Sequence, residues 1–319
     1  MKNTVEEFIE LSQDEKKELW NNAIFIFDTN ILLNLYRYSS ETSKTLISYI
    51  KQLEERVWLP YYVAYEFMKQ RCEVIFERNK IFNQIQENTK HYIENMTKIL
   101  KLNHQDSDIK ALDKLINKWL KKYKDIFKKI KYNEDYILKD LLTLFKSKVG
   151  NPYSKETYEQ LENEGKERYK NNIPPGYKDS IKKENKYGDY IIWKEIIQFS
   201  KEHKKNIIFV TNDKKEDWWN IIHGETIGIR VELRKEFLNE TNQKIHMYDM
   251  QSFINNYDQY KSVKIDTKII NEINFVENIN INILSESGNV IDDMFQQRSN
   301  SEVSIKEIKC NSIEIKEKL

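Results

Sequence analysis

Two apolar segments of the sequence run almost directly into an aspartate. The segment IFIF, residues 24–27, is followed by Asp28, and the segment IIFV, residues 207–210, is followed closely by Asp213. Continuous apolar runs of this length are typical of strands that a parallel sheet buries on both faces. Because parallel strands end at one edge of a sheet, we expect both aspartates to face the same crevice. Carboxylates placed there repel each other unless a cation lies between them.

Three further acids are placed to join this pair. Glu66 stands in an otherwise apolar helix start, Asp189 opens the segment GDYIIWKEII, and Asp217 follows Asp213 by one helical turn. The set offers only oxygen ligands, which favours Mg²⁺ or Mn²⁺ over softer metals. Carboxylates that hold such ions can activate water and bind the oxygens of a phosphodiester during hydrolysis. The residue types therefore indicate the chemistry of a nuclease.

Each acid also has a structural interpretation when it is considered alone. Asp28 and Asp189 stand at expected helix starts, where aspartate commonly caps backbone N–H groups. Glu66 could be a solvated helix residue, and Asp213 in TND could be a turn residue. Four such coincidences would all have to fall at crevice-facing positions, whereas one shared cation site explains them together.

The elements that would position the acids follow an α/β pattern. A strand at 23–27, a helix over 41–56 and a short strand VWLP at 57–60 make a β-α-β start, which favours a parallel sheet with right-handed crossovers. Further strands are expected in IIFV and in KIHMYD, residues 244–249. The acids would thus be collected from several strand ends and helix starts.

Helical and β-rich additions are expected around this core. We interpret residues 71–149 as a helical insertion into an α/β domain that spans 1–261. Beyond it, residues 262–319 form an extension of unknown role. It is predicted to be β because isoleucines alternate in it, at Ile279, Ile281 and Ile283.

The composition describes a chain without a strong overall charge. Lys and Arg number 52 against 51 Asp and Glu, a formal net charge of +1, so any attraction of nucleic acid must be local. Cys72 and Cys310 fit neither a disulfide framework nor a zinc motif, which favours a reducing compartment. No apolar run is long enough to span a bilayer. We therefore expect a cytoplasmic protein with no membrane partner.

Several blocks of the sequence resemble the PIN-like nucleases, and in particular a bacterial subgroup of them. The blocks cover roughly residues 15–260 and are specific when they occur together in this order. They read FDTNILLNLYRY, LPYYVAYEFMKQR, IPPGYKD, GDYIIWKEII, IFVTNDKKEDWW and KIHMYDMQSFI. The resemblance implies a three-layer α/β/α fold with a central parallel sheet, to which this chain would add the long helical insertion and a small β-rich C-terminal extension.

The resemblance also implies roles for single residues. The acids expected to bind the metal and act in catalysis are Asp28, Glu66, Asp189 and Asp213. Asp217 is expected as an outer metal ligand, and Asn30 and Thr211 match polar positions that orient the acids or their waters. Asp179 matches a block of the subgroup without an assigned role, and Asn212 departs from the pattern, since related sequences often carry a second aspartate there. The implied cofactor is Mg²⁺ or Mn²⁺, in an uncertain number.

RNA is the preferred substrate, because the wider resemblance is dominated by ribonucleases, many of them toxins or defence effectors. The sequence itself does not separate RNA from DNA. Lysines just before Asp189 are the candidates for phosphate contacts: Lys178, Lys182, Lys183 and Lys186. The segment 118–132 also mixes lysines with aromatic residues, but an amphipathic helix with a buried aromatic face is favoured there.

Two other functions fit parts of the pattern. A haloacid dehalogenase-like phosphatase also uses an aspartate after its first strand, but it needs a second aspartate two residues later, where this chain has Asn30. A non-catalytic module that binds nucleic acid or protein through the helical insertion would need no acid site. The complete set of four acids favours the nuclease. A regulatory protein partner or a homo-oligomer is compatible with the resemblance.

Overall fold

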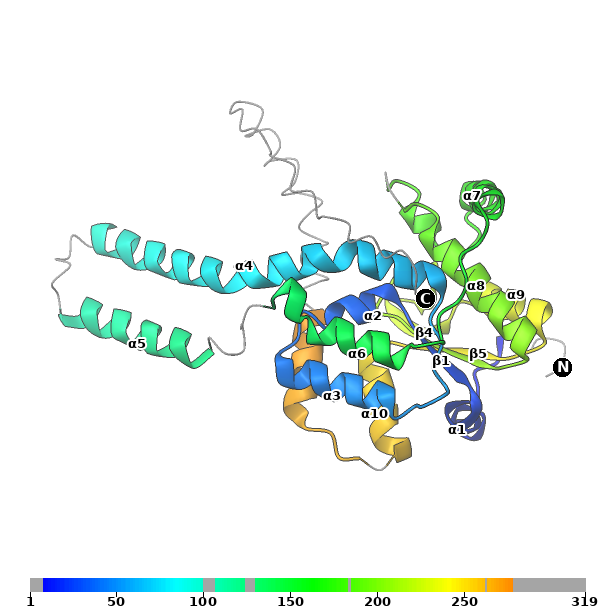
Figure 1. Ribbon diagram of the computed structural model, residues 1–319, viewed down its shortest axis with the longest axis horizontal. Coiled ribbons are helices and arrows are strands. Elements are labelled where there is room, and N and C mark those ends of the chain that lie inside the picture. Colours follow the sequence, from blue (N-terminus) through cyan, green and yellow to red (C-terminus); the bar gives the residue numbers. More distant parts are fainter. Residues whose placement is uncertain (1–7, 100–106, 124–129, 183–184, 262, 278–319) are drawn as a thin grey trace. The chain divides into compact units, whose positions relative to one another are not determined.

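The computed structural model describes residues 8–99, 107–123, 130–182, 185–261 and 263–277 (Figure 1). The chain divides into two compact units, Met1–Val276 and Glu277–Leu319, and every described residue except Glu277 lies in the first. The strand expected from the alternating isoleucines after residue 278 lies outside the described residues.

A three-stranded parallel sheet forms the centre of the first unit. Its strands, in spatial order, are β1 (Ile24–Phe27), β2 (Ile207–Val210) and β5 (Ile245–Tyr248), and all their residues are buried. β1 and β2 pair in register along their whole length, so Asp28 and Thr211 leave the sheet side by side at the carboxyl edge. This confirms the predicted parallel α/β sheet.

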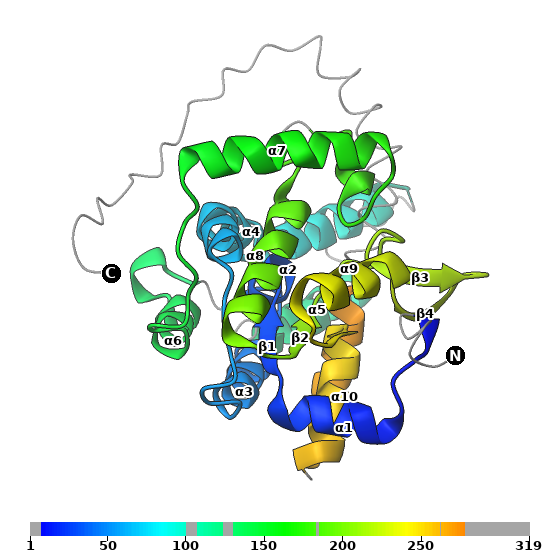
Figure 2. The same ribbon diagram turned by 90° about the vertical axis from the view of Figure 1, so that its right-hand side faces the viewer.

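Helices cover both faces of the sheet (Figures 1 and 2). α8 (Gly188–His203) and α9 (Val231–Thr241) lie on one side, and α3 (Ser40–Lys51) and α10 (Met250–Lys261) lie on the other. The result is the expected order of helix, sheet and helix.

Aromatic residues fill the interface between the sheet and the N-terminal helix α1 (Gln13–Asn22). Trp20 is fully buried, and its ring centroid lies 5.0 Å from that of Phe25 and 5.6 Å from that of Phe253. The predicted capping box of α1 is present, because Ser12 and Glu15 each accept a hydrogen bond from the other's backbone N–H. α1 thus starts where the sequence predicts and buries its aromatic end.

The segment VWLP makes isolated bridges, where the sequence predicts a strand. Val57 pairs with Phe25 and Leu59 with Val149, both in the parallel sense. Proline cannot donate to a ladder, and α4 begins directly after Pro60. Too few residues therefore remain for a longer strand.

The predicted helical insertion is built from α4 (Tyr61–Ile99), α5 (Ser107–Tyr123) and α6 (Tyr136–Leu144). The first turns of α4 pack against α2 (Thr29–Asn34) and α8, which belong to the core. Its later turns run alongside α5 (Figure 1). α7 (Lys155–Lys170) then returns the chain to α8.

Two elements differ from the sequence-based expectations. β3 (Trp219–Ile222) and β4 (Glu225–Ile229) form an antiparallel hairpin whose two turn residues both have positive φ angles, +52° at His223 and +84° at Gly224. Two left-handed residues in succession match the turn that a two-residue hairpin requires. The C-terminal extension begins with a helical stretch, residues 267–277, before the part that is not described.

Candidate active site

Asp28 follows the last residue of β1 and is the N-cap of α2. Its Oδ1 accepts the backbone N–H of Thr29 at 2.7 Å, while its Oδ2 accepts the Thr211 hydroxyl and the Asn30 amide, both at 2.6 Å. Asp28 therefore caps α2, as its structural interpretation predicts, but capping does not account for all of its contacts. One carboxylate oxygen serves the helix, and the other is bound to the end of β2.

Asn30 and Thr211 join the ends of the two strands. Asn30 donates to Thr211 Oγ1 at 3.1 Å and accepts the backbone N–H of Asn212 at 3.0 Å. Thr211, which is fully buried, also accepts the backbone N–H of Asp213 at 3.1 Å. The two residues expected to orient the acids thus contact Asp28 directly and the backbone of Asp213.

Glu66 lies in the second turn of α4 and is half-buried, so it is not a solvated surface residue. Its Oε2 accepts the Thr29 hydroxyl at 3.0 Å, which links it to the residue after Asp28. Gly188, the first residue of α8, lies against its other oxygen, since a Cβ at that position would come within 3.1 Å of Glu66 Oε1. Glu66 is therefore held where α2, α4 and α8 meet.

Asp189 is the second residue of α8 and does not cap it. The N-cap is Tyr187, which makes no side-chain capping bond. Asp189 Oδ2 instead accepts the indole N–H of Trp218 at 3.4 Å. A left-handed glycine, Gly176, passes so close that a Cβ there would lie 2.9 Å from Asp189 Cβ. Asp189 is thus fixed from two sides by segments distant in sequence.

Asp213 binds a lysine that the sequence analysis did not select. Lys215 donates its backbone N–H to Asp213 Oδ1 at 3.0 Å and its ammonium to Oδ2 at 2.8 Å. The same ammonium lies 2.8 Å from Oδ1 of Asp179, whose other oxygen accepts from Lys182. The turn interpretation of Asp213 is correct in part, because its carboxylate closes a local turn while it also holds a cation.

Asp217 is more deeply buried than Asp213, whose charge helps burial to raise the pKa of Asp217. It is fully buried, its Oδ2 accepts the backbone N–H of Lys178 at 2.9 Å, and its Oδ1 has no hydrogen-bond partner among the described residues. It anchors the short 3-10 turn Tyr177–Asp179, which carries Asp179. One oxygen of Asp217 thus supports the loop, and its role as an outer metal ligand stays a prediction.

The pKa values of three of the acids are raised by burial and by the negative charge of a neighbouring acid. Burial raises the pKa of Asp28 to about 6, and the charge of Asp213 adds to this, whereas the hydrogen bond from Thr211 opposes it. Burial raises the pKa of Glu66 to about 7, with Asp28 contributing. Burial and the charge of Asp213 raise the pKa of Asp189 well above its usual range. These acids therefore lie close enough together for the charge of one to raise the pKa of another.

The carboxylate oxygens of the site suit a hard divalent cation, but N–H and O–H groups of the chain already donate hydrogen bonds to several of them. Within the described residues, no group of three or more Asp, Glu, His or Cys side chains is arranged to hold a metal ion. Thr211 and Asn30 occupy one oxygen of Asp28, and Lys215 occupies Asp213. An ion can enter only if these donors share or yield their oxygens, which the repulsion between the acids favours.

The lysines expected to contact substrate lie at the rim of the acid cluster as far as they are described. Lys178 and Lys182 have side chains 46% and 52% exposed and pair with Glu216 and Asp179 respectively. Lys186 lies over the ring of Tyr187 at 5.9 Å. Lys183 lies outside the described residues. Both exposed ammonium groups are bound to acids, so phosphate would have to compete with those acids.

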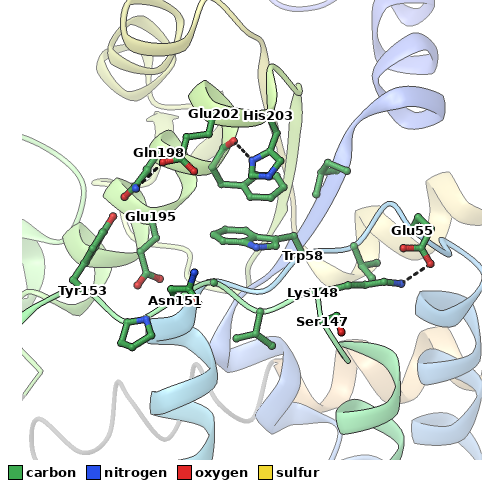
Figure 3. A pocket seen from close by; sticks show the side chains of 16 residues that line it. Glu55, Trp58, Ser147, Lys148, Asn151, Tyr153, Glu195, Gln198, Glu202 and His203 are labelled. Atoms are coloured by element: carbon green, nitrogen blue, oxygen red, sulfur yellow. Dashed lines mark hydrogen bonds and ion pairs between the residues drawn. The ribbon is translucent and has the colours of Figure 1, made fainter. Parts of the chain in front are cut away.

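A separate pocket of about 490 Å³ lies at the other end of β1, since Ile24 lines it (Figure 3). Glu195, a buried acid in its lining, accepts the backbone N–H of Tyr62 at 3.0 Å. It thus gives one N–H of the first turn of α4 an acceptor. Trp58 stacks on Phe199 with ring centroids 4.1 Å apart. None of the acids at the carboxyl edge lines this pocket.

The sequence signals for Lys215 and for the two glycines were present and had no interpretation before the fold was known. Lys215 stands two residues after Asp213, Gly188 directly precedes Asp189, and Gly176 follows two prolines in IPPGYKD. Each acts by closeness to an acid from another segment, which spacing alone does not reveal. Trp218 and Trp219 are buried and therefore belong to the core.

A parallel α/β sheet that gathers carboxylates at the carboxyl ends of its strands belongs to the class of α/β domains that bind their ligands in the crevice at that edge. A family model described as a PIN like domain matches residues 24–233, more than half of the chain, and the chain belongs to this family. Members of the family are generally metal-dependent nucleases. No curated protein and no solved structure matches the chain.

Proposed function

We propose that this protein is a Mg²⁺- or Mn²⁺-dependent endoribonuclease of the cytoplasm, of the kind found among toxins and defence effectors. The observation that carries the proposal is the convergence of Asp28, Glu66, Asp189 and Asp213, which come from four separate segments. Burial, and then the charge of a neighbouring acid, raises the pKa of the first three. A protein that needed no cation would gain stability by replacing such a set with neutral residues. Among the described residues, no helix is long and apolar enough to cross a membrane.

The residues divide the work between binding and orientation. Asp28, Glu66, Asp189 and Asp213 would hold the cation, which when bound supplies a Lewis acid for water and phosphate oxygens. Asn30 and Thr211 orient Asp28, and Thr29 orients Glu66 through its hydroxyl. Lys178, Lys182 and Lys186 are proposed to meet the phosphate backbone. Attack by water then requires no nucleophile from the chain.

The phosphatase alternative loses support from the contacts of Asn30. A phosphatase of that type needs an acid at this position to protonate the leaving group, whereas Asn30 donates to Asp28 and ties it to Thr211. The binding-module alternative would leave the clustered acids without a purpose. A regulatory partner or a second copy of the chain is compatible with the nuclease and is not required by it.

The test is cleavage of labelled single-stranded RNA and DNA in Mg²⁺, Mn²⁺ and chelator. We expect cleavage of RNA in Mn²⁺ or Mg²⁺, none in chelator, and loss of cleavage in Asp28→Asn with the fold intact. Asp14→Asn, which removes an exposed carboxylate in the first turn of α1, is the matched control and should cut normally. Undiminished cleavage by Asp28→Asn would refute the site. RNA binding that is equal in chelator and Mn²⁺, without cleavage, would favour the binding module.

A further inference from the structure

The ammonium of Lys215 lies between two carboxylates that come from different parts of the chain. It is 2.8 Å from Oδ2 of Asp213, which follows β2, and 2.8 Å from Oδ1 of Asp179, in the loop before α8. The two carboxylate side chains are only 16% and 7% exposed, so their charges are poorly screened by water. The ammonium therefore lies where two buried negative charges need a cation.

Lys215 stays charged in this position. Its ammonium donates to both carboxylates at 2.8 Å, and this contact favours the charged form over the neutral amine. Its side chain is 35% exposed, so it reaches the acids from the surface of the site. Together with Lys182, which pairs with Asp179, it balances the two negative charges without any external ion.

The other acids of the cluster lack such a partner. Within the part of the chain that the structure describes, no lysine or arginine forms an ion pair with Asp28, Glu66 or Asp189. The demand for an external cation is therefore concentrated on one side of the cluster.

We propose that Lys215 is a built-in cation that takes the place of a second divalent ion. It holds Asp179 and Asp213, and one divalent ion binds between Asp28, Glu66 and Asp189 and shares Asp213 with the ammonium. A second Mg²⁺ would need oxygens at about 2.1 Å in near-octahedral geometry, and the oxygens it would use already accept the ammonium. This inference rests on the proposed function and specifies how many ions that function uses.

The arrangement also gives Lys215 a role toward substrate. An ammonium has three donors, and the two carboxylates account for two of them. The side chain is 35% exposed, so the third donor can reach a phosphate oxygen from solvent. Lys215 would thus stabilise negative charge on phosphate, as a second ion does in a two-metal site.

The number of bound Mn²⁺ ions tests the proposal without reference to cleavage. Isothermal titration calorimetry and electron paramagnetic resonance spin counting on the full chain should give one Mn²⁺ for the wild type. Lys215→Met, which removes the charge and keeps the length of the side chain, should bind a second Mn²⁺. Lys214→Met, a neighbouring exposed lysine, is the matched control and should bind one.

Each outcome bears on a different claim. Two Mn²⁺ ions in the wild type, or an unchanged single ion in Lys215→Met, would overturn the role of Lys215 and leave the nuclease proposal standing. No Mn²⁺ binding by folded wild-type protein would overturn the proposed function as well. Lys215→Gln, which keeps a hydrogen-bond donor beside both acids without the charge, should also bind the second ion. It serves as the test if circular dichroism shows that Lys215→Met does not fold.

Discussion

Asp28 has a raised pKa even though three donors bind its carboxylate. Hydrogen bonds from Thr29 and Thr211 lower the pKa, but burial and the charge of Asp213 outweigh them. The side chain is therefore held in place by the fold while its charge is poorly compensated. This combination suits a ligand, because position is set in advance and a cation relieves the remaining repulsion.

The first prediction concerns stability as a function of pH in chelator. The folded pKa is about 6 for Asp28 and about 7 for Glu66, both above the ordinary values of 3.8 and 4.5. The folded state therefore binds protons more tightly than the unfolded state between about pH 4 and 7. The contribution of these acids to stability is greatest below about pH 4 and is lost as the pH rises through the folded pKa values. Urea unfolding should show the free energy of unfolding falling across that interval.

The second prediction concerns how much Asp28 alone contributes to the pH dependence of the free energy of unfolding. Asp28→Asn removes one charge of the cluster, so it should raise the free energy of unfolding at pH 7.5 by about 1–3 kcal/mol and change it little at pH 4. Mn²⁺ should raise the melting temperature of the wild type at pH 7.5 and raise that of the variant much less. A variant that is less stable than the wild type at pH 7.5 would show that capping outweighs repulsion.

The third prediction concerns the glycine that packs against Asp189. Gly176 has a φ of +88°, and a Cβ there would meet the Tyr169 hydroxyl and lie 2.9 Å from Asp189 Cβ. Gly176→Ala should therefore cost about 1–3 kcal/mol of stability and weaken Mn²⁺ binding by displacing Asp189. Gly224→Ala is the control, because Gly224 also has a positive φ but a Cβ there meets nothing within 4 Å. Equal losses in both variants would show that backbone strain alone is responsible.

At the scale of elements, the sequence predicts the strands whose burial pattern is continuous. β1, β2 and β5 are short apolar runs, and the acids that follow β1 and β2 meet as expected because the strands pair in register. The hairpin of β3 and β4 is not predicted from the sequence, because Trp219–Ile222 directly follows an acidic motif and was interpreted together with it. The predicted strand VWLP forms only isolated bridges, because Pro60 cannot donate to a ladder and ends the extended segment.

The candidate site could be predicted only as far as strand ends determine it. The positions of the four main acids follow from the predicted strands and helix starts. Lys215 and Gly176 instead act through contacts between segments that lie far apart in sequence. Asp179 had no assigned role in the sequence, because the partner that joins it to the acid cluster, Lys215, lies 36 residues further along the chain. Such pairs depend on how the loop before α8 folds over the end of β2, which local pattern does not encode.

The fourth prediction concerns the start of α4, the helix that carries Glu66. Glu195 accepts the backbone N–H of Tyr62, its other oxygen has no partner among the described residues, and burial raises its pKa to about 7. Glu195→Ala should cost about 1–3 kcal/mol, because a buried N–H loses its acceptor. Glu195→Gln keeps the acceptor and removes the charge, so urea unfolding at pH 8 should show little loss. A similar loss in both variants would mean that the charge itself is required.

At the scale of the whole molecule, the extension after α10 contributes to the core domain. Glu272, in the helical stretch 267–277, accepts hydrogen bonds from Ser39 and Thr42 at the start of α3. Ile265, Ile269 and Ile273 are buried in the same core. The boundary expected from the sequence, at residue 261, would remove all of these contacts, whereas the matched family region ends before them at residue 233.

Truncation at two points tests which boundary the domain needs. A chain of residues 1–277 keeps every acid and the contacts of Glu272, so it should match the full chain in melting temperature, Mn²⁺ binding and cleavage. A chain of residues 1–261 loses three buried isoleucines, each worth about 1.5–3 kcal/mol, together with the hydrogen bonds to α3. It should unfold at a much lower urea concentration or fail to fold. Equal stability of the two chains would place the boundary at residue 261. Loss of cleavage in the folded chain 1–277 would instead mean that residues 278–319 act in the reaction.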